Sequence, residues 1–485
     1  MQQENEFYEN MPLANLPEGK LPEGNKRQGN RKLYIKTYGC QMNFYDSEQM
    51  ENMMQEQGFS ISDNYYDSDL VILNTCHIRE KAAEKVYSEL GRIRAVKEAK
   101  KQQGKQLIIA VAGCVAQAEG QEITRRAPYV DIVVGPQSLQ RLPKMVNNAY
   151  DIFEKQANIK LPKSAKKLIE LDFSAVEKFD YLPNSTYIKT ALPSSFLTIQ
   201  EGCDKFCHFC VVPYTRGAEF SRPVEHILQD ARRLSDNGAK EIILLGQNVN
   251  AYHGRGSKGN IANLAELIEF IADIPDIERI RYSTSHPKDM DDELIAAHGS
   301  VAKLMPQLHL PVQSGSDNIL KAMNRKHTRD FYFNIIDKLK KVRSDITFSS
   351  DFIVGFPGET DRDFQDTIDL VKRVNYSACY SFKYSPRPGT PASVSNNQIA
   401  EAVKQERLAA LQDLLNKQQR AYNEKSIGDV TPVLIEKTGK HKGQLTGRTP
   451  YMQSVSFACD KSKIGQILNI KIVESTGNSL IGEMI

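Results

Sequence analysis

The stretch FLTIQEGCDKFCHFC, residues 196–210, joins an apolar strand-like run to a loop with three cysteines. These are Cys203, Cys207 and Cys210, in a C-x3-C-x2-C spacing. Thiolates this close on one loop can converge on one cluster. A structural zinc site normally takes four protein ligands, and His208 inside the loop is badly placed to be the fourth. Three cysteines on a 4Fe-4S cluster would leave one iron open, so the pattern favours iron and sulfur over zinc.

Strand-like runs alternate with helical sequence from this loop to about residue 394, and a long amphipathic helix is expected from Gln398 to about Lys425. Six strands are too few for a closed eight-stranded barrel. We therefore predict a central partial (β/α)6 barrel over residues 191–420. The six candidate strands are FLTIQEGC, KEIILLGQ, RIRYSTS, QLHLPVQSG, ITFSSDFIVGFPGE and ACYSFKYSP.

A second alternating region precedes the first, over residues 32–149. Its strand-like runs are KLYIKTYGC, LVILNTC, LIIAVAGC and DIVVG. Helices are expected from Asp46 to Gln57 and from Arg79 to about Lys101. Such alternation predicts a Rossmann-like α/β domain with a parallel sheet.

Three of the strands in this region end in a cysteine: Cys40, Cys76 and Cys114. The carboxyl ends of parallel strands face one crevice, and the helix N-termini that follow them favour a thiolate. A single cysteine at a strand end is more often a small buried hydrophobic residue. Because the coincidence occurs three times, we predict one shared site.

The remaining segments differ in character from these two regions. Residues 1–31 are polar and rich in Gly and Pro, so we expect a disordered leader. Residues 150–190 carry Lys-rich sequence broken by Pro, which predicts a linker. Residues 421–485 contain short apolar runs bounded by Gly, which is typical of a small all-β barrel.

The composition sets further limits. A chain of 485 residues is expected to fold as two or three domains. The net charge of +3 is too small to argue for nucleic acid by itself. No apolar run is long enough for a membrane span and no targeting pattern is evident, so a cytoplasmic protein without membrane contact is expected. In that compartment, cysteines are more plausibly metal ligands or nucleophiles than partners in disulfides. Cys379 and Cys459, inside strand patterns, are expected to be packing residues.

Taken together, the motifs resemble those of the radical methylthiotransferases, a family of the radical S-adenosylmethionine superfamily, whose cysteine loop includes an aromatic residue at the position of Phe209. The resemblance implies an amino-terminal domain with an auxiliary 4Fe-4S cluster, a radical core with a second 4Fe-4S cluster, and a carboxyl-terminal TRAM barrel. It also implies that Cys40, Cys76 and Cys114 bind the auxiliary cluster. The motifs are TYGCQMNFYDSEQM, LNTCHIREKAAEKV, VAGCVAQ, EGCDKFCHFCVVPYTRGAEFSR, LLGQNVNAY, HLPVQSGS, DFIVGFPGET and SPRPGTPA.

Within this family, the QMN sequence at residues 41–43 and the IREKA sequence at residues 78–82 resemble the branch that acts on N6-isopentenyladenosine of tRNA. A second branch acts on threonylcarbamoyladenosine of tRNA and a third on an aspartate of a ribosomal protein. Both stay open as alternatives. A metal-stabilised RNA-binding protein without catalysis is the alternative from another class, and it predicts zinc.

The remaining motifs supply candidate binding residues. The residues expected at S-adenosylmethionine are Phe209, Gln247, Asn248, Asp351, Gly355, Pro357, Gly358 and Glu359. The residues expected at the substrate are Arg216, Arg222, Asn250, His309, Gln313, Lys440, Lys442 and Arg448. Each type also has an ordinary structural explanation: Asn and Gly form turns, a Glu is common in a first helical turn, a lone barrel histidine is often a core residue, and a charged hairpin is usually only solvated.

The resemblance implies a reaction in two stages, with one S-adenosylmethionine used in each. A methyl group passes first to a sulfur on the auxiliary cluster. Radical chemistry then activates carbon 2 of adenine, and this carbon receives the methylthio group. Carbon 2 is not acidic enough for a side-chain base, which is why a radical is needed. The implied partners are the tRNA anticodon stem-loop, an electron donor such as a flavodoxin or ferredoxin, and the iron-sulfur assembly machinery.

Overall fold

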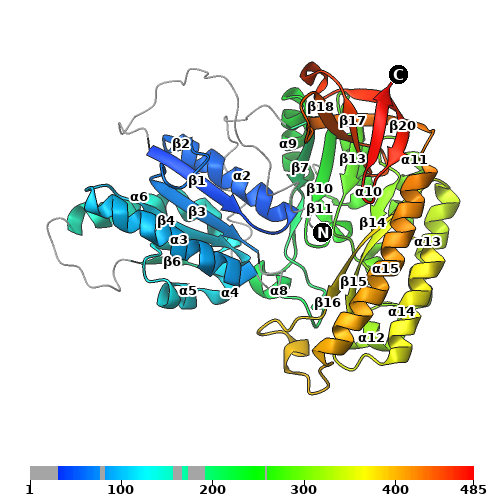
Figure 1. The fold of residues 1–485 in the computed structure, drawn as a ribbon, viewed down its shortest axis with the longest axis horizontal. Coiled ribbons are helices and arrows are strands. Elements are labelled where there is room, and N and C mark those ends of the chain that lie inside the picture. Colours follow the sequence, from blue (N-terminus) through cyan, green and yellow to red (C-terminus); the bar gives the residue numbers. More distant parts are fainter. Residues whose placement is uncertain (1–30, 77–81, 157–166, 173–191, 257–258) are drawn as a thin grey trace. The chain divides into compact units, whose positions relative to one another are not determined.

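The computed structural model describes residues 31–76, 82–156, 167–172, 192–256 and 259–485, which form two compact units (Figure 1). Unit 1 comprises Met1–Ile188 and Val211–Ala218, and unit 2 comprises Lys189–Cys210 and Glu219–Ile485. The expected leader up to residue 30, the IREKA motif except for Ala82, and most of the expected linker lie outside the described residues. Arg31, expected as the last residue of the leader, is instead the first residue of β1. Within those ranges, no helix combines the length and the apolar character that crossing a membrane would require.

Unit 1 contains a six-stranded parallel sheet in the order β2-β1-β3-β4-β5-β6. The strands predicted from the four apolar runs are β1, β3, β4 and β5, and the prediction of a parallel α/β domain is confirmed. The strands are β1 (Arg31–Thr37), β2 (Phe59–Ile61), β3 (Leu70–Thr75), β4 (Ile108–Gly113), β5 (Ile132–Val134) and β6 (Leu168–Glu170).

Helices cover both faces of this sheet because each central strand is apolar on both sides. In β3, Leu70 and Ile72 pack against one set of helices, and Val71 and Leu73 pack against the other. This is the pattern of a parallel sheet buried between two helical layers. The first layer is α2 (Gln41–Glu56) with α6 (Leu142–Gln156), and the second is α3 (Ala82–Gln102), α4 (Cys114–Glu119) and α5 (Gln121–Arg126).

Two boundaries in unit 1 differ from the sequence-based prediction. Helix α2 begins at Gln41, five residues before the expected Asp46, because Cys40 adopts an extended backbone and takes the N-cap position. The expected linker over residues 150–190 overlaps the end of α6 and includes β6, which pairs in parallel with β5. Three residues are too few to show a period, so the sequence did not indicate this strand.

Unit 2 contains the six predicted strands of the partial barrel. Two hydrogen-bonded sheets, β7-β10-β13 and β14-β15-β16, are joined by a single parallel bridge between Ile280 and Leu304. Every pairing within the two sheets is parallel. The strands are β7 (Ser194–Thr198), β10 (Glu241–Leu245), β13 (Arg279–Tyr282), β14 (Gln307–His309), β15 (Thr347–Val354) and β16 (Ala378–Lys383).

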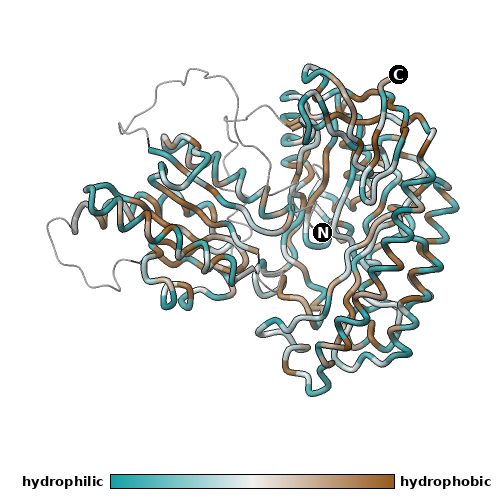
Figure 2. The backbone as a smooth tube through the Cα atoms, in the orientation of Figure 1, coloured by the Kyte–Doolittle hydropathy of each residue, from teal (hydrophilic) through white to brown (hydrophobic). Residues whose placement is uncertain are grey.

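One continuous apolar core lies between these strands and the helices outside them. Hydrophobic residues coincide with the strands, whereas the helices alternate between hydrophobic and hydrophilic residues (Figure 2). The long helix α15 begins at Glu401, three residues after the expected Gln398. The helices are α9 (Val224–Asp236), α10 (Leu264–Ala272), α11 (Asp292–Ser300), α12 (Asp317–Ala322), α13 (Arg329–Val342), α14 (Asp361–Val374) and α15 (Glu401–Lys425).

The carboxyl-terminal residues form the predicted small barrel, which is closed in the order β17-β18-β19-β21-β20. Alternate residues of its strands fill the interior, with Phe457 and Ile470 among the most buried. The strands are β17 (Val430–Thr438), β18 (Gln444–Arg448), β19 (Ser454–Ala458), β20 (Ile467–Ser475) and β21 (Leu480–Met484).

Two buried arginines of β13 attach the small barrel to the partial barrel within unit 2. Arg279 donates hydrogen bonds to two carbonyl oxygens of the small barrel at 2.9 and 2.8 Å. Arg281 donates to the carbonyl oxygen of Thr449 at 2.9 Å and to the buried carboxylate of Glu241 at 2.8 Å. Because both guanidinium groups are at most 3 % exposed, their hydrogen bonds are shielded from water.

Candidate functional site

The three cysteines of unit 1 lie at the carboxyl ends of adjacent strands, as predicted. Cys40 precedes α2 after β1, Cys76 directly follows β3, and Cys114 is the first residue of α4 after β4. Since β1, β3 and β4 are neighbours in the sheet, the three residues share one edge.

The thiols at this edge influence one another. A hydrogen bond from Cys76 and the nearby positive charge of Arg216 lower the pKa of Cys40 to about 6, although burial opposes the shift. Burial raises the pKa of Cys114, against the effect of the same arginine. An arginine beside the thiols favours their thiolate forms, which are the forms that bind metal.

Two glycines allow the strand ends to approach closely. At Gly39, where φ is +109°, an added Cβ would lie 2.0 Å from the Cβ of Cys76. At Gly113, where φ is +88°, it would lie 2.4 Å from the carbonyl oxygen of Thr75. Only glycine fits both the conformation and the space at these positions.

Arg216 belongs to the cysteine site of unit 1, whereas the sequence suggested a surface residue that grips the substrate. Its side chain is 2 % exposed and forms a 2.6 Å ion pair with Asp46. It also donates to the side-chain oxygen of Asn43 at 3.2 Å, and its own carbonyl accepts a 2.7 Å bond from Gln137. The roles of Asn43 and Asp46 were not predicted from the sequence, although their spacing of three residues places both on one helical face next to Cys40.

In unit 2, the cysteine loop follows the short strand β8 (Gln200–Glu201). His208 contacts the chain after α12, through its backbone N–H to the carbonyl of Met323 at 3.0 Å and its ring to that of Ala322 at 2.8 Å. Asn324 donates to the carbonyl of Phe206 at 2.9 Å. Residues 322–324 thus hold the loop from one side.

Phe209 and Cys203 show how this loop is buried. The Phe209 ring packs on a small apolar cluster that includes Met323 and Phe356. Burial raises the pKa of the Cys203 thiol to about 11. In this structure Phe209 therefore anchors the loop through apolar packing.

Several buried polar atoms beside the loop have no hydrogen-bond partner in the described structure. They include Oδ1 of Asn248, Nε2 of His286, Nε of Arg325 and Nε2 of His327. Burial lowers the pKa of His286 and lowers that of His327 to about 4, so both imidazoles are neutral at pH 7. Unsatisfied buried polar groups call for a polar ligand or water, which fits the amino and carboxylate groups of S-adenosylmethionine. Neither histidine could be predicted from the sequence, because neither belongs to a recognisable motif.

The described residues contain no group of three His, Cys, Asp or Glu side chains arranged to hold one metal ion. A 4Fe-4S cluster does not need that arrangement, because its cysteines bind different irons. All eight cysteines are free thiols. The two groups of three cysteines therefore fit clusters better than single ions.

The amide side chains after β10 hold the turn together. Gln247 accepts the N–H of Gly202 at 2.7 Å, which connects this turn to the cysteine loop. Asn248 donates to Asp289 at 2.8 Å. Both ends of the Asn250 amide bond the backbone of His286, so Asn250, expected at the substrate, has a structural role here.

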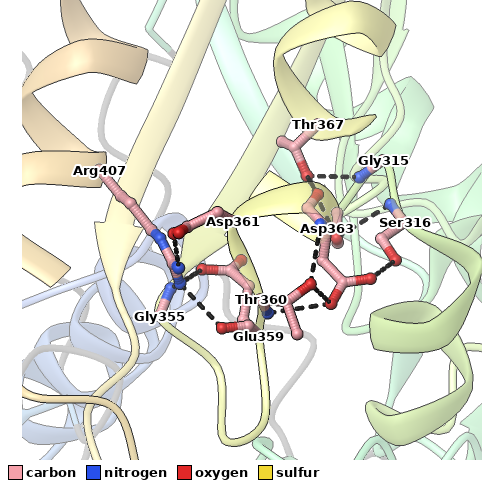
Figure 3. A network of polar contacts seen from close by, with 10 residues as sticks. Gly315, Ser316, Gly355, Glu359, Thr360, Asp361, Asp363, Thr367 and Arg407 are labelled. Atoms are coloured by element: carbon pink, nitrogen blue, oxygen red, sulfur yellow. Dashed lines mark hydrogen bonds and ion pairs between the residues drawn. The ribbon is translucent and has the colours of Figure 1, made fainter. Parts of the chain in front are cut away.

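Glu359 turns back towards its own strand (Figure 3). Its Oε2 accepts the N–H of Gly355 at 2.7 Å and a guanidinium N–H of Arg407 at 2.8 Å, and the residue is 3 % exposed. Burial raises the pKa of this carboxyl group. The carboxylate thus supports the turn after β15, while its Oε1 is buried without a partner.

The glycines of this turn face α15 and the segment that precedes it. An added Cβ on Gly355 would meet the side chain of Lys404 at 2.4 Å, and one on Gly358 would meet that of Asn397 at 2.5 Å. Pro357, between them, is buried. The glycines therefore permit close packing of protein against protein on their Cβ side.

His309, Asp351 and Gln313 lie on or next to β14 and β15. The Nε2 of His309 is 3.6 Å from Oδ1 of Asp351, and its Nδ1 is 2.9 Å from the hydroxyl of Ser349. Gln313 has a φ of +76° and bridges to Phe352. Leu308 packs in the core with the outer helices, so His309 points to the opposite side, the barrel interior, as predicted.

The remaining basic candidates divide into buried and exposed residues. Arg222 is 7 % exposed and donates to the carbonyl of Thr198 and to Asp230, both at 2.7 Å, so it is not displayed to a substrate. Lys440 and Lys442 are exposed between β17 and β18. Arg448 is mostly buried, and its Nε lies 3.5 Å from Oε2 of Glu436.

Three parts of the chain match known families. Residues 32–135 match the uncharacterized protein family UPF0004, residues 197–371 the radical SAM superfamily, and residues 424–485 the TRAM domain.

Two similar curated proteins come from Rickettsia felis and Rickettsia bellii (strain RML369-C), and each is named tRNA-2-methylthio-N(6)-dimethylallyladenosine synthase. Both are 57 % identical to this chain. The first alignment covers 94 % of this chain and all of the relative, and the second covers 94 % and 99 %.

Among solved structures, the radical S-adenosylmethionine methyltransferase TsrM from Kitasatospora setae resembles this chain in fold. With tryptophan and a SAM analogue bound, it has a TM-score of 0.52 and 14 % identity over 75 % of each chain. With cobalamin and a [4Fe-4S] cluster bound, it has a TM-score of 0.53 and 13 % identity over 76 % of this chain and 74 % of its own. At such identity the likeness concerns the fold alone.

Proposed function

The chain belongs to the tRNA-2-methylthio-N(6)-dimethylallyladenosine synthases, and from this premise we propose that it adds a methylthio group to carbon 2 of N6-isopentenyladenosine beside the anticodon of tRNA. It is then a transferase, and the reaction takes place in the cytoplasm. One observation carries the proposal: the described chain contains two separate groups of three cysteines, one at the carboxyl ends of three neighbouring parallel strands and one on a single loop after β8.

Each group of cysteines would hold one 4Fe-4S cluster. Cys203, Cys207 and Cys210 would bind the cluster that meets S-adenosylmethionine, and the strand-end cysteines of unit 1 would bind the auxiliary one. When bound, the two clusters and two S-adenosylmethionine molecules per turnover would supply the electron, the radical that removes hydrogen from carbon 2, and the methylthio group.

The protein's own residues position these groups. The chain after α12 holds the cysteine loop in place, and the unsatisfied atoms of Asn248, His286 and His327 are suitably polar to bond the amino-acid end of S-adenosylmethionine. Asp351, with His309 beside it, presents a carboxylate to the barrel interior. Glu359 would act on the cofactor through the turn that it supports.

The TRAM barrel would recognise tRNA, with the anticodon stem-loop as its ligand. Lys440 and Lys442 are exposed on one hairpin, where they can contact phosphate. Arg448, whose side chain already lies close to Glu436, would contribute to tRNA binding indirectly, by fixing the position of β18. A flavodoxin or ferredoxin would supply electrons, and the iron-sulfur assembly machinery would load the clusters.

The test is the iron and sulfide content after anaerobic reconstitution, together with S-adenosylmethionine cleavage and analysis of the tRNA product. The wild type is expected to hold about eight irons, and a chain with Cys203, Cys207 and Cys210 replaced by alanine about four, with cleavage lost. Zinc, or an unchanged iron count, would instead support a non-catalytic RNA-binding protein.

The substrate is tested in the same assay with three acceptors: tRNA with N6-isopentenyladenosine, tRNA with threonylcarbamoyladenosine, and a ribosomal protein with an accessible aspartate. Methylthiolation of only the first supports the proposal. Modification of either of the others would assign the chain to another branch of the chemistry.

A further inference from the structure

Arg325 lies in unit 2 and belongs to none of the motifs quoted above, which therefore do not explain its position. It is 5 % exposed and lies between α12 and α13. One guanidinium nitrogen donates to the carbonyl of Pro311 at 2.5 Å. The other lies 3.5 Å from Sγ of Cys207, within the range of a hydrogen bond to sulfur.

The backbone around Arg325 is held in an unusual conformation. Asn324 and Lys326, on either side of it, both have a φ of +60°. For residues other than glycine the left-handed region costs about 1 kcal/mol or more each. Such a conformation persists only where the surroundings enforce it, and here it directs the intervening arginine inward.

The charge of Arg325 has no carboxylate partner among the residues that the structure describes; its guanidinium group contacts a carbonyl and a thiol. A buried cation without a counter-charge is strongly unfavourable. A thiolate-ligated 4Fe-4S cluster is an anion, and its negative charge grows by one on reduction. It would therefore compensate the guanidinium, and most fully in the reduced state.

We propose that Arg325 is a positioning residue that tunes the radical cluster, by donating a hydrogen bond to the Cys207 ligand and so favouring the reduced cluster. This inference rests on the proposed function for the presence of that cluster. Hydrogen bonds to ligand sulfurs and nearby charge are recognised determinants of cluster potential. The step that they assist is the transfer of one electron from a donor of the flavodoxin or ferredoxin class to the oxidised cluster, with no bond broken in the protein.

The decisive measurement is a redox titration followed by electron paramagnetic resonance, in the absence of S-adenosylmethionine and RNA. Full-length chains with Cys40, Cys76 and Cys114 replaced by alanine contain only the cluster of interest. We expect Arg325→Gln to lower the ratio of reduced to oxidised cluster at a fixed potential by about tenfold or more, which is ~59 mV for one electron. Arg325→Lys, which keeps the charge, should recover part of the shift.

Arg329→Gln is the matched control, because Arg329 is partly exposed and already paired with Asp366 at 3.1 Å. The reduction potential of the cluster in this variant should equal that of the cluster in the parent chain. An unchanged potential in Arg325→Gln with a fully loaded cluster would overturn the inference, whereas failure of the parent chain to bind any cluster would overturn the proposed function itself.

A second experiment keeps the inference falsifiable if the Arg325 variants do not fold. The parent chain, with Cys40, Cys76 and Cys114 replaced by alanine, is labelled with 15N-arginine. Pulsed electron paramagnetic resonance of its reduced cluster should show a nitrogen coupling from a guanidinium group close to the iron and sulfur. Absence of any arginine coupling would contradict the hydrogen bond between Arg325 and Cys207.

Discussion

The two groups of three cysteines are brought together by opposite routes. In unit 2 the three residues lie on one loop within eight positions of the sequence, and contacts from residues 322–324 hold that loop. In unit 1 they come from three strand ends between Cys40 and Cys114, and the sheet itself brings them together. The loop therefore needs a local support, whereas the strand-end site exists only after its domain has folded.

This difference implies different sensitivities to mutation. Changes in the packing of unit 1 should disturb the strand-end site directly, because strand register and turn geometry set the cysteine positions. Changes near the loop should act through how well it is held.

The largest effect should come from replacing Cys40, Cys76 and Cys114 together by alanine. We expect methylthiolated tRNA to fall below detection while S-adenosylmethionine cleavage continues, because the loop of unit 2 is intact. Mass spectrometry of digested tRNA and assay of 5′-deoxyadenosine measure the two outcomes. Cys459→Ala, outside both groups, is the control; product formation by the triple variant would refute the division of roles.

Next in size is the buried ion pair of Arg216 and Asp46, whose side chains are 2 % and 1 % exposed. Arg216→Met should lower the free energy of unfolding by about 3–5 kcal/mol, because it leaves a buried carboxylate without its partner. Urea denaturation of the metal-free protein measures this. The double variant with Asp46→Leu should regain much of the loss, and a single-variant loss below about 1 kcal/mol would contradict the buried charge pair.

Gly39→Ala should destabilise the strand-end site by roughly 2–4 kcal/mol, since its Cβ would overlap Cys76 and its φ is unfavourable. Gly58→Ala is a matched control, because Gly58 also has a positive φ, +86°, but nothing lies within 4 Å of the added Cβ. The control should lose only about 1 kcal/mol. Equal losses in thermal or urea denaturation would show that the contact with Cys76 is unimportant.

The smallest effect is expected at Asn324, which supports the cysteine loop of unit 2. Asn324→Gly removes its hydrogen bond to Phe206, worth about 1 kcal/mol, but tolerates the positive φ. Asn324→Ala adds strain of about 1 kcal/mol. Iron release to a chelator should therefore be slowest in the wild type, intermediate in the glycine variant and fastest in the alanine variant; identical rates would mean that the loop needs no such support.

Much of the architecture could be predicted from the sequence because its signals are local and periodic. The strand runs and the cysteine at the end of each one were sufficient to place Cys40, Cys76 and Cys114 at one edge. Strand β6 was missed because three residues carry no period, and α2 was predicted to begin late because its N-cap is a cysteine.

The individual binding residues were harder to predict because their partners are distant in sequence. Arg216 and Arg222 look like surface arginines, yet each is buried against a carboxylate that no motif connects with it. His286 and His327 are distant in sequence, and the fold of the barrel brings their ring centres to within 5.7 Å of each other. Such pairings depend on tertiary packing, which periodicity cannot report.

The attachment of the small barrel through Arg279 and Arg281 has a consequence for how the protein can change. Three of the acceptors are carbonyl oxygens of the main chain, which every amino acid supplies. The contacts that attach the barrel therefore do not depend on which side chains it carries at these positions, so a change of side chain there would leave the attachment in place. The two arginines have no such freedom: without the barrel Arg279 would lose both of these carbonyl partners, and Arg281 would keep only the carboxylate of Glu241.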